Sequence, residues 1–237
     1  MKKQSPRGFT LIELVIVVAL IAFIGTMALQ SYFDSTDKFG FLSQYREAVS
    51  IFRTVRSDAV NNRQVAVVGD EPGEVSQELP SYYGVYIAAD CLATFADVAQ
   101  GEDAEDLQFD MPADFTLSGG AGFCSLPAVQ DPAKDKVLKA IDLGAQGLRV
   151  EAYPSSTTEV QLQLPLVAYY QTGSGNLTLF ENVLGEASLL AKTTDKFVTM
   201  KFFQADDVTN QQFMALYQVS GLAEELTGKQ FNEIYGL

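Results

Sequence analysis

A single acidic residue stands near the start of a long apolar run. Glu13 is the fifth residue of the stretch 9–29, which holds no other charged residue. An ionised carboxylate at the centre of a bilayer costs roughly 2.5–3.5 kcal/mol on insertion scales. A charge in this position needs a cationic partner, because a buried charge is tolerated only when it is paired. Gly8 lies directly before the run, behind the basic residues Lys2, Lys3 and Arg7.

The apolar run is long enough to cross a membrane. As a helix, residues 9–29 would extend about 31 Å, close to the thickness of the hydrocarbon core. A secretory signal peptide would have a shorter apolar region and a small-residue cleavage site after it, and this sequence has neither. The basic residues before the run predict that this end stays in the cytoplasm and that the bulk of the chain is exported.

Helical periodicity continues beyond the apolar run. Apolar residues recur there at spacings of three and four, as on one face of an amphipathic helix. No proline occurs between residues 9 and 62. We therefore predict one helix from about Phe9 to about Asn62, whose second half packs its apolar stripe on a globular domain. The stripe consists of Phe41, Tyr45, Val49, Phe52, Val55 and Ala59.

After Asn62 the pattern changes to the two-residue period of strands. Residues 172–175 predict a hairpin loop, and Pro165 indicates an edge strand or a bulge. A helix followed by antiparallel strands predicts an α+β fold, with the amphipathic half of the helix on one sheet face. We expect a long surface loop at 101–132 and a short helix near the C-terminus. The predicted strands are 64–69, 82–87, 148–154, 159–170, 176–181, 197–204 and 213–219.

The composition argues against catalysis and against nucleic-acid binding. The chain has 16 basic and 30 acidic residues, a net charge of −14, and no histidine. A strongly acidic protein repels phosphates, and a chain without histidine lacks the commonest general base. We expect Arg53, Arg56 and Arg63 to pair with carboxylates rather than with DNA. The Gly-rich stretch 119–122 lacks the Lys-Ser/Thr of a phosphate loop. The sequence predicts no enzyme and no cofactor.

The two cysteines, Cys91 and Cys124, both follow the membrane segment. If this region is exported, they predict one disulfide that closes a loop of about 34 residues. Such a loop would contribute on the order of 3–4 kcal/mol in the chain-entropy model. The alternative, two buried thiols, stays open.

Two groups of acidic residues are weak candidates for Ca²⁺ ligands, because calcium prefers oxygen ligands. Neither has the spacing of an EF-hand loop. Acidic residues in loops are usually solvated, so the sequence predicts no metal site. The candidates are Glu102, Asp103, Glu105 and Asp106, with Asp206 and Asp207 as a second pair.

The stretch Gly8-Phe9-Thr10-Leu11-Ile12-Glu13, behind a short basic leader, resembles the class III signal of type IV prepilins and type II secretion pseudopilins. The resemblance implies that a membrane aspartyl prepilin peptidase cuts between Gly8 and Phe9 and that Phe9 is then methylated. Glu13 matches the family's glutamate at the fifth mature position, which neutralises the new amine of a neighbouring subunit. Many type IV pilins have a proline near the end of the run, where this chain has Ala28-Leu29-Gln30-Ser31.

A second, weaker resemblance lies at the predicted helix-to-strand junction. Arg56 and Ala59, followed by Asn61 or Asn62 and then by 65–68, are similar to H-type minor pseudopilins and their pilus counterparts. The similarity covers about 20 residues. Any amphipathic helix that leads into a strand is an alternative explanation.

The sequence thus predicts a pilin-like subunit of a type IV pilus or a type II secretion pseudopilus, in the role of a minor subunit. Its parts would be a cleaved leader (1–8), a transmembrane assembly helix (9–29), an amphipathic continuation (30–62) and an exported β-rich domain (63–237). Its expected partners are other pilin or pseudopilin subunits, the prepilin peptidase and an inner-membrane assembly platform. The alternative is an exported binding domain, possibly Ca²⁺-dependent, on an uncleaved membrane anchor. The choice among secretion, motility, adhesion and DNA uptake stays open.

Overall fold

A computed structural model gives the structure of the chain and describes residues 11–68, 75–98, 136–155, 161–183, 186–189 and 196–236. The chain divides into two compact units, one up to Leu42 and one from Ser43 onward. Helix α1 (Leu11–Val60) contributes to both units, and all described strands belong to the second. The long helix is confirmed over these residues, since no proline interrupts its backbone hydrogen bonds.

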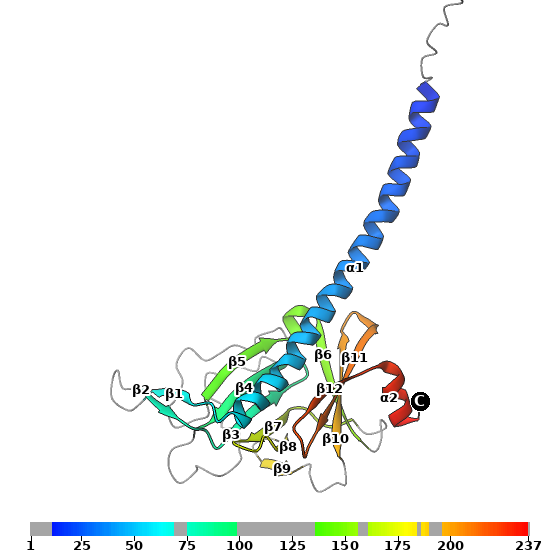
Figure 1. The fold of residues 1–237 in the computed structure, drawn as a ribbon. Coiled ribbons are helices and arrows are strands. Elements are labelled where there is room, and N and C mark those ends of the chain that lie inside the picture. Colours follow the sequence, from blue (N-terminus) through cyan, green and yellow to red (C-terminus); the bar gives the residue numbers. More distant parts are fainter. Residues whose placement is uncertain are drawn as a thin grey trace, which may run out of the picture. The chain divides into compact units, whose positions relative to one another are not determined.

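The larger sheet of the second unit has six antiparallel strands in the order β5-β4-β3-β7-β8-β9 (Figure 1). Every residue of β4 is buried, so this strand has no solvated face. One face of the sheet carries a buried aromatic cluster that includes Tyr86, Phe95 and Tyr169. The strands are β3 (Tyr82–Ile87), β4 (Cys91–Asp97), β5 (Lys136–Asp142), β7 (Leu166–Gln171), β8 (Leu177–Val183) and β9 (Glu186–Leu189).

The smaller sheet has four antiparallel strands in the order β12-β11-β10-β6. The predicted alternation in β10 is confirmed, because Val198, Met200 and Phe202 are all buried. The strands are β6 (Leu148–Pro154), β10 (Phe197–Gln204), β11 (Asp207–Tyr217) and β12 (Ala223–Leu226). The other described elements are the hairpin of β1 (Val65–Val68) and β2 (Val75–Glu78), the short 3-10 helix η1 (Gly144–Gln146) and α2 (Gly228–Tyr235).

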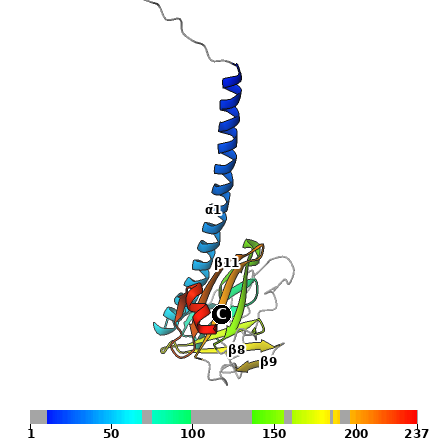
Figure 2. The same ribbon diagram turned by 90° about the vertical axis from the view of Figure 1, so that its right-hand side faces the viewer.

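Helix α2 covers the outer face of the smaller sheet (Figure 2). Thr227 and Gln230 start this helix with a capping box, in which each side chain bonds to the backbone of the other residue. Phe231 then stacks on Phe213 of β11, with ring centroids 4.0 Å apart. The predicted C-terminal helix is therefore present and is held by an aromatic contact.

From Ser43 onward, α1 packs against both sheets. The predicted stripe is buried over this part, namely at Tyr45, Val49, Phe52, Val55 and Ala59. The Tyr45 hydroxyl donates a hydrogen bond of 2.9 Å to the Phe213 carbonyl in the smaller sheet. In the larger sheet, Lys139 Nζ lies 2.9 Å from Glu47 Oε1. The α+β prediction is confirmed, with two sheets against the helix where one was expected.

The prediction that Pro165 marks an edge strand or a bulge is wrong. Strand β7 begins one residue later, at Leu166, and is central, because it pairs with both β3 and β8. The missing N–H of Pro165 therefore falls outside the ladder of hydrogen bonds. Before it, Leu162 forms only an isolated bridge with Ala152. The predicted strand 159–170 is thus a strand only in its second half.

The predicted hairpin loop at 172–175 is confirmed. It joins the paired strands β7 and β8, and Gly173 and Gly175 have positive φ angles of 83° and 67°. Glycine adopts this backbone conformation without steric cost. The predicted surface loop at 101–132 lies outside the described residues.

Candidate functional site

The first part of α1 is apolar on all sides. Within the described residues, Leu11–Leu29 is the one helical segment long and apolar enough to cross a membrane, with a mean hydropathy of 2.6. Its side chains are exposed around the whole helix, for example Leu14 at 61% and Phe23 at 59%. A helix that is apolar all round belongs in a non-aqueous environment. Lipid or other apolar helices must therefore surround this segment.

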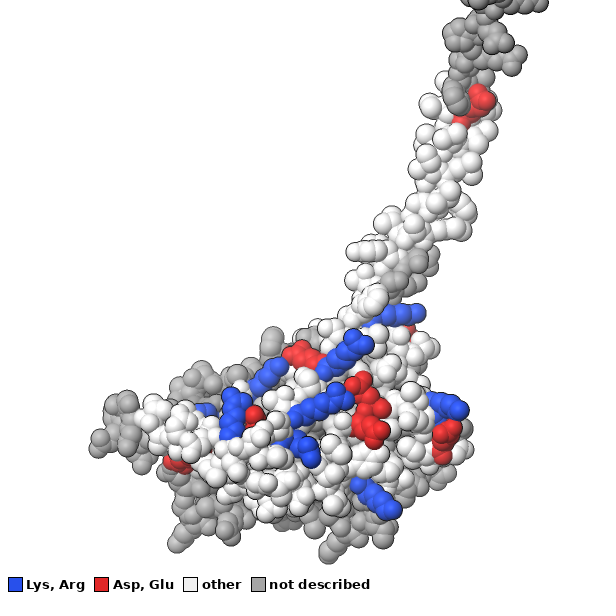
Figure 3. Space-filling view, viewed as in Figure 1, with Lys and Arg blue, Asp and Glu red and all other residues white. Residues whose placement is uncertain are grey.

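Glu13 lies in the first turn of α1 as described. It is the only charged residue in 11–29, and Figure 3 shows a single acidic group on this otherwise uncharged segment. The N-terminal end of a helix favours a negative charge, because its N–H groups point along the axis toward it. Gly8 and Phe9 lie outside the described residues.

The end of α1 turns sharply into β1 at Asn62. Asn62 has a positive φ of 52°, the left-handed conformation that Asn adopts more readily than most residues. The Asn62 N–H donates to the Ala59 carbonyl at 3.3 Å, and the Arg63 N–H donates to the Asp58 carbonyl at 3.0 Å. This pair of bonds is a Schellman motif, which satisfies the last carbonyls of the helix.

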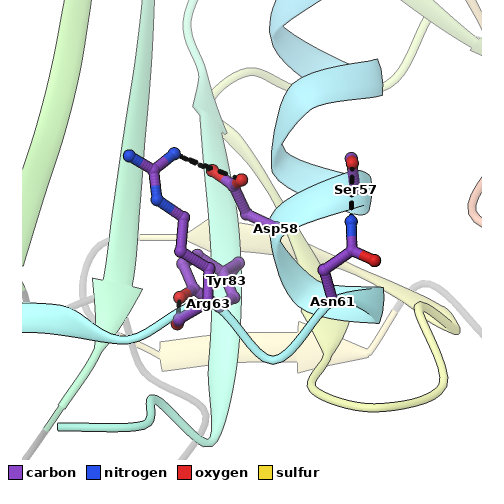
Figure 4. Close-up of polar contacts among 5 residues, drawn as sticks. All are labelled: Ser57, Asp58, Asn61, Arg63 and Tyr83. Carbon is purple, nitrogen blue, oxygen red and sulfur yellow. Dashed lines mark hydrogen bonds and ion pairs between the residues drawn. The ribbon is translucent and has the colours of Figure 1, made fainter.

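Side chains hold the same junction in place (Figure 4). Arg63 Nη1 lies 3.0 Å from Asp58 Oδ2, and the Tyr83 hydroxyl of β3 donates to the Arg63 carbonyl. Burial raises the pKa of Tyr83 to about 12, because an ionised phenolate would lose its hydration. Asn61 Nδ2 bonds to Ser57 Oγ at 3.1 Å on the exposed side of the helix.

Residues of the second resemblance fix neighbouring loops. Arg56 Nε donates to the Ser220 carbonyl at 2.8 Å, in the turn between β11 and β12. The carbonyl of Ala59, which is fully buried, accepts from the Gly173 N–H at 2.8 Å. Of the three arginines expected to pair with carboxylates, Arg53 pairs with Glu225 at 3.1 Å and Arg63 with Asp58. Arg56 differs, because it binds a backbone carbonyl.

A groove of about 430 Å³ runs between α1 and the edge strand β5. We call it the α1–β5 groove. Apolar side chains of both elements line it, among them Ile51, Val55 and Leu138. Three cationic side chains and one carboxylate also line it, namely Arg63, Lys136, Lys139 and Asp58.

The groove was not predicted from the sequence, because β5 was not predicted. The residues Lys-Val-Leu-Lys-Ala-Ile-Asp at 136–142 contain the signal, four apolar residues among the seven. A register shift at Thr94/Phe95 leaves Leu138 as an extra residue in β5 and breaks the alternation that would have identified the strand.

The other predicted site residues are only partly within the described chain. Cys91 is buried at the start of β4, whereas Cys124 lies outside the described residues, so their pairing stays a prediction. The acidic candidates Glu102, Asp103, Glu105 and Asp106 also lie outside. Asp207 accepts hydrogen bonds from Thr209 and Asn210 in the turn between β10 and β11. Among the described residues no group of three possible metal ligands occurs.

Comparison with known families identifies the N-terminal segment. Residues 3–29 match the family described as a prokaryotic N-terminal methylation motif. The match includes Gly8, Phe9 and Glu13 and ends where the membrane-length segment ends. The chain therefore carries a signal of the type IV pilin and pseudopilin type. No curated protein and no solved structure matches the chain.

Proposed function

We propose that the chain is a pilin-like structural subunit that is cleaved between Gly8 and Phe9 and assembled into a type IV pilus or a type II secretion pseudopilus. The observation that carries this proposal is the methylation motif at 3–29, which lies over a helix whose apolar side chains are exposed. In this role the protein acts by packing its helix against those of other subunits, not by catalysis.

Cleavage would change the electrostatics of the membrane segment. Hydrolysis of the Gly8–Phe9 bond removes the basic leader and leaves a cationic α-amine on Phe9, which is then methylated. The Glu13 carboxylate of one subunit would neutralise the amine of its neighbour. Because a charge in an apolar environment is costly until it is paired, only one stagger of the two helices satisfies both groups. Glu13 would thereby specify how far each subunit is displaced along the filament.

The proposed location follows from the same segment. The leader end would lie in the cytoplasm, the apolar helix in the inner membrane, and the β-rich unit on the exported side. The partners would be a prepilin peptidase, an inner-membrane assembly platform and other pilin or pseudopilin subunits. The exported side would also permit the Cys91–Cys124 disulfide.

Within this class, we assign the chain to the minor subunits of the H type. The support is the junction, where Arg56, Ala59 and Asn62 each form a specific backbone contact at the end of α1. The composition of purified filaments tests this assignment. A minor subunit would be present at a small fraction of the major one, and a chain that forms most of the filament would contradict it.

Mass spectrometry of the N-terminus tests processing. The full chain, isolated from the membranes of cells that have a prepilin peptidase, is expected to begin with methylated Phe9. An intact leader from Met1 to Arg7 would contradict the proposal and favour the uncleaved, membrane-tethered binding domain. In that case, calorimetric titration with Ca²⁺ would show whether the domain binds calcium.

Substitution of Glu13 tests assembly separately. Glu13→Ala is expected to insert and to be cleaved normally, but to enter filaments at least about tenfold less, because the amine of its neighbour loses its partner. The control is Asp37→Asn, which removes an exposed acid from the same helix. Normal filament number and length in Glu13→Ala would refute this role.

A further inference from the structure

Positive charge is concentrated on one face of an acidic protein. Removal of the leader takes away three of the 16 basic residues and none of the 30 acidic ones, which leaves a net charge of −17. Six of the remaining basic residues lie in 43–68 and 136–142, together with three acidic ones. These two segments therefore carry +3, and the rest of the processed chain carries −20. Figure 3 shows Lys and Arg gathered over the second part of α1 and the strands beside it.

The α1–β5 groove lies within this cationic region. Lys136 and Lys139 project from β5 on the side of α1, since Lys139 pairs with Glu47 and both lysines line the groove. Arg63 reaches the groove from the other side of the junction, where Figure 4 shows its guanidinium directed at Asp58. An apolar floor with cationic groups at the rim fits a surface that presents carboxylates beside apolar side chains.

The two ion pairs in the groove are easily exchanged. The Lys139 and Glu47 side chains are 54% and 46% exposed, and that of Arg63 is 64% exposed. Exposed ion pairs contribute on the order of 0–1 kcal/mol, because water and salt screen them. Lys136 has no ion pair within the described residues. Carboxylates of an incoming partner can therefore replace Glu47 and Asp58 at little cost and can add a contact to Lys136.

We propose that the α1–β5 groove docks an acidic surface of a second copy of this chain. The inference rests on the proposed function, in which processed subunits lie side by side. Copies with a charge of −17 repel one another unless the cationic face of one meets an acidic part of the next. Such a contact joins two different surfaces and is heterologous, so its repetition gives an open array rather than a closed dimer. The copies bind through side chains, since lysines on edge strand β5 oppose direct strand pairing.

Site-specific photo-crosslinking in the membranes of producing cells tests this contact. A benzophenone amino acid at Gln64, an exposed residue that lines the groove, leaves all its charges in place. The full chain is expected to give an adduct of two copies after irradiation. The same probe at Gln211, an exposed residue of β11, is the positional control and is expected to give at least about tenfold less of this adduct.

Charge reversal shows whether the groove itself is responsible. Lys136→Glu/Lys139→Glu is expected to lower the Gln64 adduct about tenfold, the effect of losing two charge contacts of about 0.7 kcal/mol each. The matched control, Lys196→Glu/Lys229→Glu, changes the net charge equally at two exposed lysines elsewhere and is expected to leave the adduct within twofold.

Three results would overturn the inference: no adduct from Gln64, an adduct only with a different protein, or an equal loss in both double variants. A chain that keeps its leader would instead refute the proposed function. A processed chain that enters filaments but gives no two-copy adduct would refute the groove contact alone.

Discussion

The first and second parts of α1 share one backbone conformation but have opposite surroundings. In 11–29 the apolar side chains are exposed around the whole helix, whereas from Ser43 to Val60 they form one buried stripe. Leu20 in the first part is 55% exposed, and Phe52 in the second is fully buried. The first part must therefore find its apolar contacts in lipid or in other chains, whereas the second finds them in its own sheets.

The comparison shows how a single helix can serve assembly and folding separately. Residues of the first part contribute nothing to the packing of the globular unit, so changes there should alter membrane insertion and assembly without unfolding it. Residues of the second part hold the two sheets to the helix. The stability of the globular unit should therefore depend strongly on position along α1.

The largest expected difference is between Phe52→Ala and Leu20→Ala. Phe52→Ala removes a buried ring from the stripe and is expected to lower the free energy of unfolding by about 3–5 kcal/mol. Leu20→Ala changes a side chain outside the globular unit and is expected to leave that energy within about 0.5 kcal/mol. Urea unfolding of the full chain in detergent micelles, followed by pulse proteolysis, measures both. Equal losses in the two variants would contradict the division of α1.

A smaller effect is expected where the buried part of the helix ends. Asn62→Ala places a β-carbon without a local hydrogen-bonding group in the left-handed region and is expected to cost about 1–2 kcal/mol. Asn62→Gly keeps that conformation accessible and is expected to change stability by only a few tenths of a kcal/mol. The same unfolding assay separates them. A harmless Asn62→Ala would show that the turn into β1 does not require this conformation.

The smallest effect concerns Tyr83, which bonds to the junction from β3. At neutral pH, Tyr83→Phe removes one hydrogen bond and is expected to cost about 0.5–1.5 kcal/mol.

The pH dependence of this contact has a defined sign. The pKa of Tyr83 is about 12 in the folded chain, against 10.0 for a free phenol. The folded state therefore keeps a proton that the unfolded chain releases, and stability present below pH 10 is lost as pH rises from 10 to 12. Over this interval the urea midpoint of the parent chain should fall more than that of Tyr83→Phe. Parallel decreases would contradict the assignment.

The strands that follow a two-residue period were predictable. The bounds of β3, β6 and β10 agree with the predicted ranges, because one face of β6 and β10 is more buried than the other and the glycines and prolines around β3 mark its ends. Strand β4 could not be identified in this way, since all its residues are buried and both faces carry apolar side chains.

The two parts of the candidate site differ in the same respect. The processing signal is contiguous, because a peptidase reads a short segment of chain, and residues 3–29 contain all of it. The α1–β5 groove brings Asp58 and Arg63 together with Lys136 and Lys139, more than 70 residues further on. No local pattern predicts which distant strand comes to lie beside a helix, so the groove required the structure.

Helix α2 also determines the order in which the exported unit can mature. The outer aromatic face of the smaller sheet is covered by Phe231, which is translated and exported after every described strand. Until that residue has crossed the membrane, Phe213 and its neighbours have no cover, and such exposed faces are prone to aggregation during folding. We therefore expect translocation to precede closure of the domain, so that a chain stalled before residue 228 is a substrate for periplasmic chaperones and proteases.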